Sequence, residues 1–191
     1  MRSAVRSALV AAGFLSATIL VAVSVLRSPA PAAEPPATAT ASVTVPSAPR
    51  TVEGMRIRVP RLGIDLPLRE GDAGRDIPSE SSPGATPEGA AFHFPGTAVP
   101  GSRGNAYLYA HARVGMFLAL WQAQVGDRVE LILPGGGVLA YSVAEVHPQV
   151  PSSDTSWLQP TSDERLTLQT STGPTPAHPR FIVVARRDLP S

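Results

Sequence analysis

A hydroxyl and a guanidinium, nine residues apart near the end of the chain, each stand at the end of a predicted strand. Residues 166–170 alternate apolar and polar side chains, as a half-buried strand does, and lead into Ser171. Residues 181–185 are continuously apolar, as in a strand buried on both faces, and follow Arg180. The loop between them holds Gly173 and three prolines, which cannot donate to a sheet ladder. We therefore expect Ser171 and Arg180 to meet at one rim of a sheet, where loops on a rigid scaffold hold reactive groups.

A third reactive side chain follows another predicted strand. Residues 106–110 are typical of a buried strand, and they deliver His111 at their end. An imidazole can serve as a general acid or base near neutral pH. Taken singly, each of these residues more often has a structural role than a catalytic one. A serine such as Ser171 is usually a structural hydroxyl at a strand end, a histidine such as His111 a packed core or rim residue, and an arginine such as Arg180 a solvated edge charge. Only their joint placement at strand ends supports a catalytic hypothesis.

The residues around these positions resemble the sortase family of cell-surface cysteine transpeptidases, with most similarity to its class D, E and F members. Residues 167–171, TLQTS, are similar to the T-L-x-T-C motif of the family, and Arg180 before FIVVA resembles the arginine that opens its last strand. Residues 95–105, PGTAVPGSRGN, with the strand and AHAR that follow, are similar to the segment that ends in the catalytic histidine. Residues 57–68 resemble the opening of sortase domains, so the resemblance covers residues 55–187.

The resemblance implies an enzyme of the transpeptidase or hydrolase type. Such a protein cuts the C-terminal sorting signal of a secreted protein and passes the fragment to a cell-wall or pilin amine acceptor. Carried over by position, His111 is the general acid/base, Arg180 stabilises the oxyanion or positions the peptide, and Ser171 occupies the place of the nucleophile. The resemblance also implies that Thr170 and Asn105 bind substrate.

Ser171 stands where the family has cysteine, and the chain contains no cysteine at all. A cysteine of pKa ≈ 8.5 is a few per cent thiolate at neutral pH, whereas a serine needs a base in contact and a third group that orients the base. His111 would be that base, and Asp65, Asp154 or Asp163 would orient it, but spacing does not choose among them. Two functions stay open: a working serine variant, and a non-catalytic sortase-fold domain that binds extended surface peptides.

The N-terminal part predicts a membrane protein. Residues 8–26 carry no charge and are flanked by arginines. At ~1.5 Å per residue they can cross a ~30 Å hydrocarbon layer, with the basic leading end in the cytoplasm. We predict a transmembrane anchor over residues 1–27, a Pro/Ala/Thr-rich linker over 28–54 and an extracellular domain over 55–191. A signal peptide cleaved near Ala30-Pro31-Ala32 is the alternative.

Composition narrows the fold and the partners. A net charge of +1 gives no reason to expect a nucleic-acid partner. His93, His147 and His178 lack metal-ligand spacing, and we expect no metal or cofactor. The 21 prolines and 16 glycines favour short strands joined by turns. The pattern and the resemblance together predict an all-β fold, a closed barrel of seven to eight strands with one or two short helices. The expected strands are residues 55–60, 64–68, 106–110, 128–133, 138–146, 166–170 and 181–185, with a short helix over 117–124 and loops over 70–91 and 148–163.

Overall fold

The computed structural model describes residues 51–77 and 85–189. The predicted anchor, its alternative cleavage site and most of the predicted linker lie outside these residues. Within the described ranges, no helix is both long enough and apolar enough to cross a membrane.

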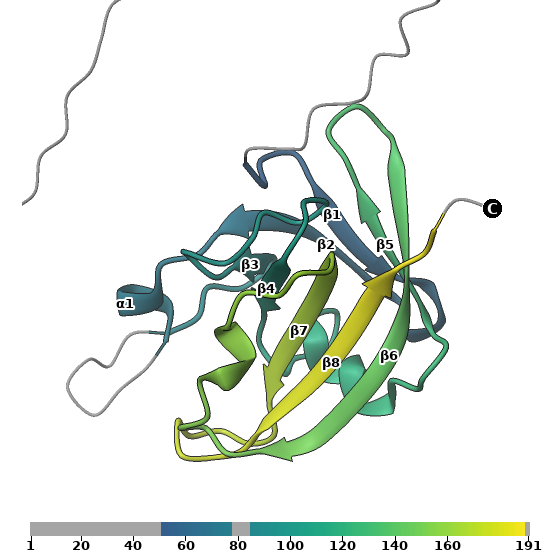
Figure 1. Cartoon of the computed structure of the whole chain (residues 1–191). Helices are drawn as coiled ribbons and strands as arrows, with labels where there is room; N and C mark the ends of the chain where they lie inside the picture. The colour runs from purple at the N-terminus through teal and green to yellow at the C-terminus, as the bar shows by residue number, and fades with distance from the viewer. Residues whose placement is uncertain (1–50, 78–84, 190–191) are drawn as a thin grey trace, which may run out of the picture. The chain divides into compact units, whose positions relative to one another are not determined.

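Eight strands close into a barrel in the order β1-β2-β3-β4-β7-β8-β6-β5, with β5 paired to β1 (Figure 1). The all-β closed barrel is thus confirmed. The strands are β1 (Arg56–Val59), β2 (Ile64–Glu70), β3 (Ala91–His93), β4 (Asn105–Tyr109), β5 (Arg128–Ile132), β6 (Val138–Val150), β7 (Arg165–Ser171) and β8 (Arg180–Arg187). The helical turns are η1 (Pro60–Leu62), α1 (Ala73–Asp76), η2 (Phe117–Gln122) and η3 (Ser156–Leu158).

Two of the strand pairs are parallel, and both affect the position of the site. β2 pairs with β3, and β4 pairs with β7 from Asn105↔Arg165 to Tyr109↔Gln169. The remaining pairs are antiparallel, and in the last of them Ser171 lies opposite Arg180. Because parallel strands end at the same edge, β4 and β7 deliver the residues that follow them to one side of the barrel.

The barrel interior is an apolar core to which each of the eight strands contributes. Its fully buried residues include Ile57, Leu108, Leu131, Leu168 and Val183. A second layer covers part of the outside, where aromatic residues of β3 and β4 pack against the loop after β6. This layer contains Phe92, Tyr107 and Tyr109 against Phe94, Trp157 and Leu158. Residues 181–185 of β8 are buried on both faces, as predicted: Phe181, Val183 and Ala185 face the core, and Ile182 and Val184 pack with Val150 and Trp157 on the outside.

The sequence missed some local structure. The three-residue β3 was not predicted, because so short a segment shows no period of its own. The predicted hairpin is present, but β6 runs on to Val150 through two register shifts, beyond the predicted end at residue 146. The helix expected over residues 117–124 is a 3₁₀ helix that ends at Gln122.

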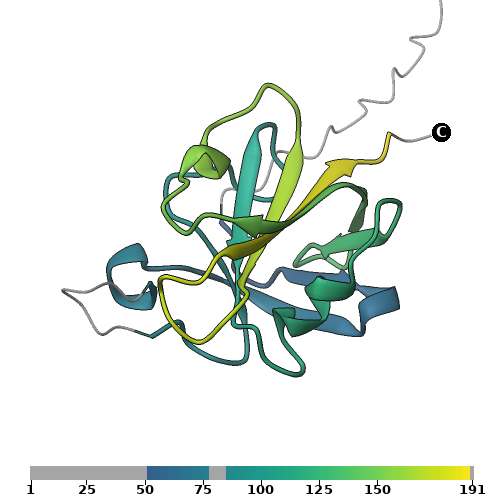
Figure 2. The ribbon, with the colours of Figure 1, turned by 90° about the horizontal axis from the view of Figure 1, so that it is seen from below.

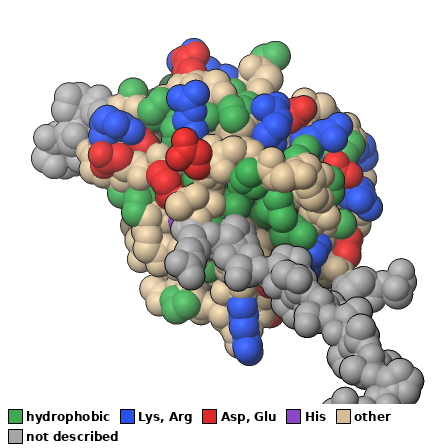
Figure 3. Space-filling view, turned by 90° about the horizontal axis from the view of Figure 1, so that it is seen from above, with side chains coloured by type: hydrophobic (Ala, Val, Ile, Leu, Met, Phe, Trp, Pro, Cys, Tyr) green, Lys and Arg blue, Asp and Glu red, His purple; other side chains and the backbone are tan. Residues whose placement is uncertain are grey.

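Three connections project from one side of the barrel and surround the outer face of β4 and β7 (Figure 2). They are the described part of the β2–β3 segment with α1, the β6–β7 loop with η3, and the β7–β8 loop. On the face seen in Figure 3, acidic and basic side chains are interspersed instead of gathered by sign, in agreement with the low net charge.

We expect Gly71→Ala to destabilise the domain. A Cβ at Gly71 would clash with the Tyr109 hydroxyl and lie 2.7 Å from the His93 carbonyl oxygen. Overpacking of this kind typically reduces the free energy of unfolding by about 1–3 kcal/mol. Urea unfolding measures the loss. Gly135→Ala is the matched control, because no atom lies within 4 Å of its added Cβ, and equal stability of the two variants would contradict the prediction.

Candidate active site

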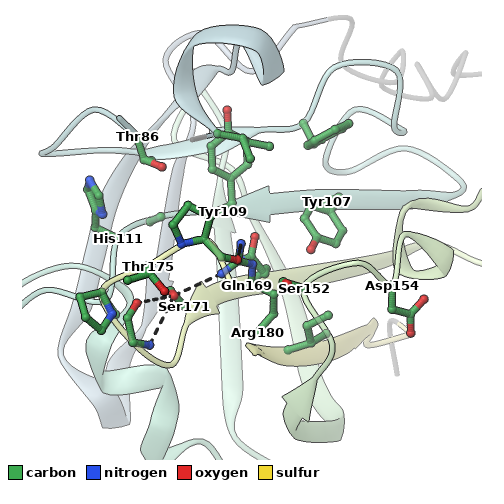
Figure 4. A pocket seen from close by; sticks show the side chains of 18 of the residues that line it. Thr86, Tyr107, Tyr109, His111, Ser152, Asp154, Gln169, Ser171, Thr175 and Arg180 are labelled. Atoms are coloured by element: carbon green, nitrogen blue, oxygen red, sulfur yellow. Dashed lines mark hydrogen bonds between the residues drawn. The ribbon is translucent and has the colours of Figure 1, made fainter. Parts of the chain in front are cut away.

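A pocket of about 660 Å³ lies on the outer face of β4, β7 and β8, enclosed by the three projecting connections (Figure 4). Its floor includes Tyr107, Tyr109, Gln169 and Ile182. These side chains point outward because alternate residues of a strand face opposite sides of the sheet. The volume is within the usual range of small-molecule and cofactor sites, about 300–1,000 Å³.

Ser171, Arg180 and His111 all line this pocket. Ser171 ends β7 and Arg180 opens β8, and their pairing brings the guanidinium Nη1 within 3.3 Å of the Ser171 hydroxyl, to which it donates. The Ser171 hydroxyl donates to the Gly173 carbonyl oxygen at 2.7 Å. The two side chains thus meet at one rim, as their positions in the sequence predict.

Arg180 carries a charge without a carboxylate partner among the described residues. Its Nη1 also donates to the His178 carbonyl oxygen, and its Nη2 to that of Pro176. The side chain is half-buried, and burial lowers the pKa of its guanidinium. A cation held by neutral groups in such a place attracts an anionic or strongly polar ligand.

His111 follows β4 after Ala110 and lies at the edge of the pocket in Figure 4. Its imidazole makes no hydrogen bond to Ser171 or to any other described residue. The three carboxylates considered as orienting groups are engaged elsewhere. Asp65 pairs with Arg56, Asp163 pairs with Arg186, and Asp154 accepts from the backbone of Ser156 and the indole of Trp157. Within residues 51–77 and 85–189, the structure contains no serine–histidine–carboxylate triad at this site.

Thr170 and Asn105 are buried and bond to the protein itself. The Thr170 hydroxyl donates to the Ala110 carbonyl oxygen at 2.9 Å, which ties the residue before Ser171 to the residue before His111. Neither Thr170 nor Asn105 lines the pocket of Ser171. Their assignment to substrate binding stays a prediction, and the contacts described here are structural.

Asn105 anchors one wall of the pocket. Its amide nitrogen donates to the carbonyl oxygens of Trp157 (2.7 Å) and Gln159 (3.1 Å), and its amide oxygen accepts from the Thr167 hydroxyl (2.7 Å). The β6–β7 loop that contains Trp157 is therefore held in place from beneath. An asparagine after a glycine at a strand start gives no sequence signal of this role.

Asp76, the last residue of α1, holds this segment against β4, and nothing in the sequence around it signals that role. Its buried carboxylate accepts from the Tyr109 hydroxyl and the Asp72 backbone at 2.8 Å each and from Arg75 at 2.8 Å. Burial acts to raise the pKa of Asp76, but the hydrogen bonds from Asp72, Arg75 and Tyr109 outweigh it, so the pKa lies below its ordinary value. Asp76 thereby fixes the wall that carries Ile77.

The fold and the site define a small β-barrel protein with a pocket of mixed apolar and polar lining on the outer face of three adjacent strands. Residues 57–188 match the family model described as Sortase domain, and the chain belongs to the sortase family. No curated protein matches the chain in sequence.

Solved sortase structures share the fold. A Clostridium perfringens Sortase D5 transpeptidase is 24% identical over 71% of this chain and 78% of that chain, with a TM-score of 0.55. Sortase A of Listeria monocytogenes is 22% identical over 71% of this chain and 87% of that one, with a TM-score of 0.58. Sortase A of Corynebacterium diphtheriae is 25% identical over 71% and 61%, with a TM-score of 0.57.

Asp76→Asn should destabilise the domain in a pH-dependent way. Because the pKa of Asp76 is lowered by folding, its stabilising effect is present above the unfolded-state pKa of about 3.9 and is lost as the pH falls through the folded-state value. At neutral pH the variant should lose about 1–3 kcal/mol of unfolding free energy, and the difference should shrink below about pH 4. Urea unfolding across this range measures both effects. Asp65→Asn, at an exposed ion pair, is the control; a deficit for Asp76→Asn that does not vary with pH would refute the explanation.

Asn105→Ala should loosen the β6–β7 loop, because the carbonyls of Trp157 and Gln159 lose their donor. We expect faster hydrogen exchange over residues 151–163 and a loss of about 1–3 kcal/mol in stability. Arg103→Ala removes an exposed hydrogen bond to the Ser162 carbonyl oxygen of the same loop, and it should change exchange little. Unchanged exchange in Asn105→Ala would show that the loop does not need this anchor.

Proposed function

We propose that this protein binds the C-terminal sorting signals of secreted proteins at the cell surface. Its sortase fold and the convergence of Ser171, His111 and Arg180 on one pocket support this function. That convergence is the observation on which the proposal rests, since the three side chains come from separate parts of the chain. A membrane anchor at the N-terminus and a cell-wall or pilin amine acceptor are parts of the same proposal.

The pocket suits an extended peptide. Apolar side chains of the peptide would contact Tyr107, Leu158 and Ile182, which line the floor and one wall. The free N–H groups of Arg180 would donate to oxygen atoms of the peptide. Asn105 and Asp76 hold the walls in place before the ligand arrives, which reduces the entropy lost on binding.

We propose that recognition dominates and that acyl transfer by Ser171 is slow or absent. The Ser171 hydroxyl donates a hydrogen bond to the Gly173 carbonyl oxygen, which is not a base. The charged side chain that bonds to this hydroxyl is Arg180, which is a donor. General-base assistance contributes about 10²–10⁴ in rate, and an alcohol depends on it far more than a thiolate does. Among the residues that the structure describes, no carboxylate is hydrogen-bonded to His111 to orient it for that task.

Acyl transfer through Ser171 is the second candidate, and the hydrogen bond from Arg180 favours it because a guanidinium stabilises negative charge at the hydroxyl oxygen. In that reaction the Ser171 oxygen attacks the scissile carbonyl and its proton passes to His111. The leaving amine takes the proton from His111. An amine acceptor or water then cleaves the ester, and the hydroxyl of Ser171 is restored.

The natural full chain, Ser171→Cys and Ser171→Ala separate the two candidates. Each is offered fluorogenic sorting peptides with and without an amine acceptor, and binding is measured by fluorescence anisotropy. We expect all three to bind, and the natural chain to cleave at least about 10²-fold more slowly than Ser171→Cys. Rapid cleavage by the natural chain, lost in Ser171→Ala, would favour acyl transfer, and absence of binding by all three would reject the proposed function.

A further inference from the structure

We propose that Arg180 and Tyr107 form a carboxylate-binding subsite, so that the protein prefers peptides ending in a free carboxylate to uninterrupted or amidated ones. The inference rests on the proposed peptide-binding function and names the chemical class of peptide that the pocket takes. Hydrolysis at a sorting signal produces such a peptide acid.

Tyr107 is the first observation. It is 7% exposed and lines the pocket, and Figure 4 shows its hydroxyl directed into the pocket. That hydroxyl makes no hydrogen bond with the described part of the chain. The other two tyrosines differ, because Tyr109 donates to Asp76 and Tyr141 donates to Glu164. Since buried tyrosine hydroxyls normally have a partner, Tyr107 is available to a ligand.

Arg180 is the second observation. Its three hydrogen bonds use both N–H groups of Nη1 and one of Nη2, so within the described part of the chain the Nε and the second Nη2 N–H groups are free for a ligand. Burial raises the pKa of Tyr107 and the charge of Arg180 lowers it, so the two groups interact electrostatically. Among the described residues that line the pocket, Asp154 alone is acidic. Its carboxylate already accepts hydrogen bonds from the Ser156 backbone and the Trp157 indole.

The chemistry of these groups selects a carboxylate. A guanidinium and a phenol directed at one space are both donors, and the guanidinium is charged. A carboxylate offers two oxygen atoms and a compensating charge, whereas a peptide carbonyl offers one neutral oxygen. Because Arg180 also contacts the Ser171 hydroxyl, the bound carboxylate would lie at the end of β7, where a peptide cut at this site would end.

The test compares matched peptides on the purified full chain. Short fluorescein-labelled peptides are screened for the tightest binder, which is then prepared as a free acid, as a C-terminal amide and with additional residues. Anisotropy should show the free acid binding about 10-fold more tightly than the amide. Tyr107→Phe should reduce affinity for the free acid about three- to tenfold and leave the amide nearly unchanged. Arg180→Gln should abolish the preference for the acid.

Tyr141→Phe and Arg186→Gln are matched controls, since neither residue lines the pocket, and both should keep the preference. Thermal unfolding of each variant identifies losses due to misfolding; the conservative Tyr107→Phe keeps the test decisive if Arg180→Gln does not fold. Equal affinity for the acid and the amide overturns the subsite and leaves peptide binding intact. An acid preference that persists in Tyr107→Phe and Arg180→Gln also overturns it, and absence of binding to any peptide overturns the proposed function as well.

Discussion

The parallel pairing of β4 with β7 is the constraint on which the site depends. It ends both strands at the same edge of the barrel, and the hydrogen bond from Thr170 to the Ala110 carbonyl oxygen continues the contact past the last ladder pair. His111 directly follows Ala110, and Ser171 directly follows Thr170. Antiparallel pairing with β8 then sets Arg180 opposite Ser171. A slip of one residue in either pairing would turn the outward-facing side chains into the core.

Most charged side chains in the described part of the domain are paired with an opposite charge, and Arg180 is among the exceptions. Buried or half-buried carboxylates such as Asp76 and Asp127 are paired with Arg75 and Arg61, and most remaining arginines of the strands lie beside acidic residues. Arg180 is held by carbonyl oxygens and a hydroxyl instead. Its charge is therefore left for the contents of the pocket, and the low-dielectric surroundings strengthen whatever it binds.

The family resemblance places Ser171 at the position of a cysteine nucleophile, and the proposed function follows from this difference in chemistry. Ser171 ends β7, and its hydroxyl donates to the Gly173 carbonyl oxygen in the β7–β8 loop. A thiol would carry its own nucleophilicity into this position, whereas the hydroxyl requires an oriented base. Walls fixed by Asn105 and Asp76, and a floor rich in aromatic side chains, are useful to recognition whether or not a bond is broken.

The sequence by itself determined the strand pattern, the placement of Ser171, His111 and Arg180 at strand ends, and the all-β class, because alternation and turn residues are local properties of the chain. It could not determine the parallel pairs, β3, the extension of β6, or the anchoring roles of Asp76 and Asn105. Those depend on contacts between residues distant in the chain, such as Asn105 with Trp157, that exist only once the barrel is closed. The same holds for the three aspartates that could have oriented His111. Only the tertiary structure directs Asp65, Asp154 and Asp163 to other partners.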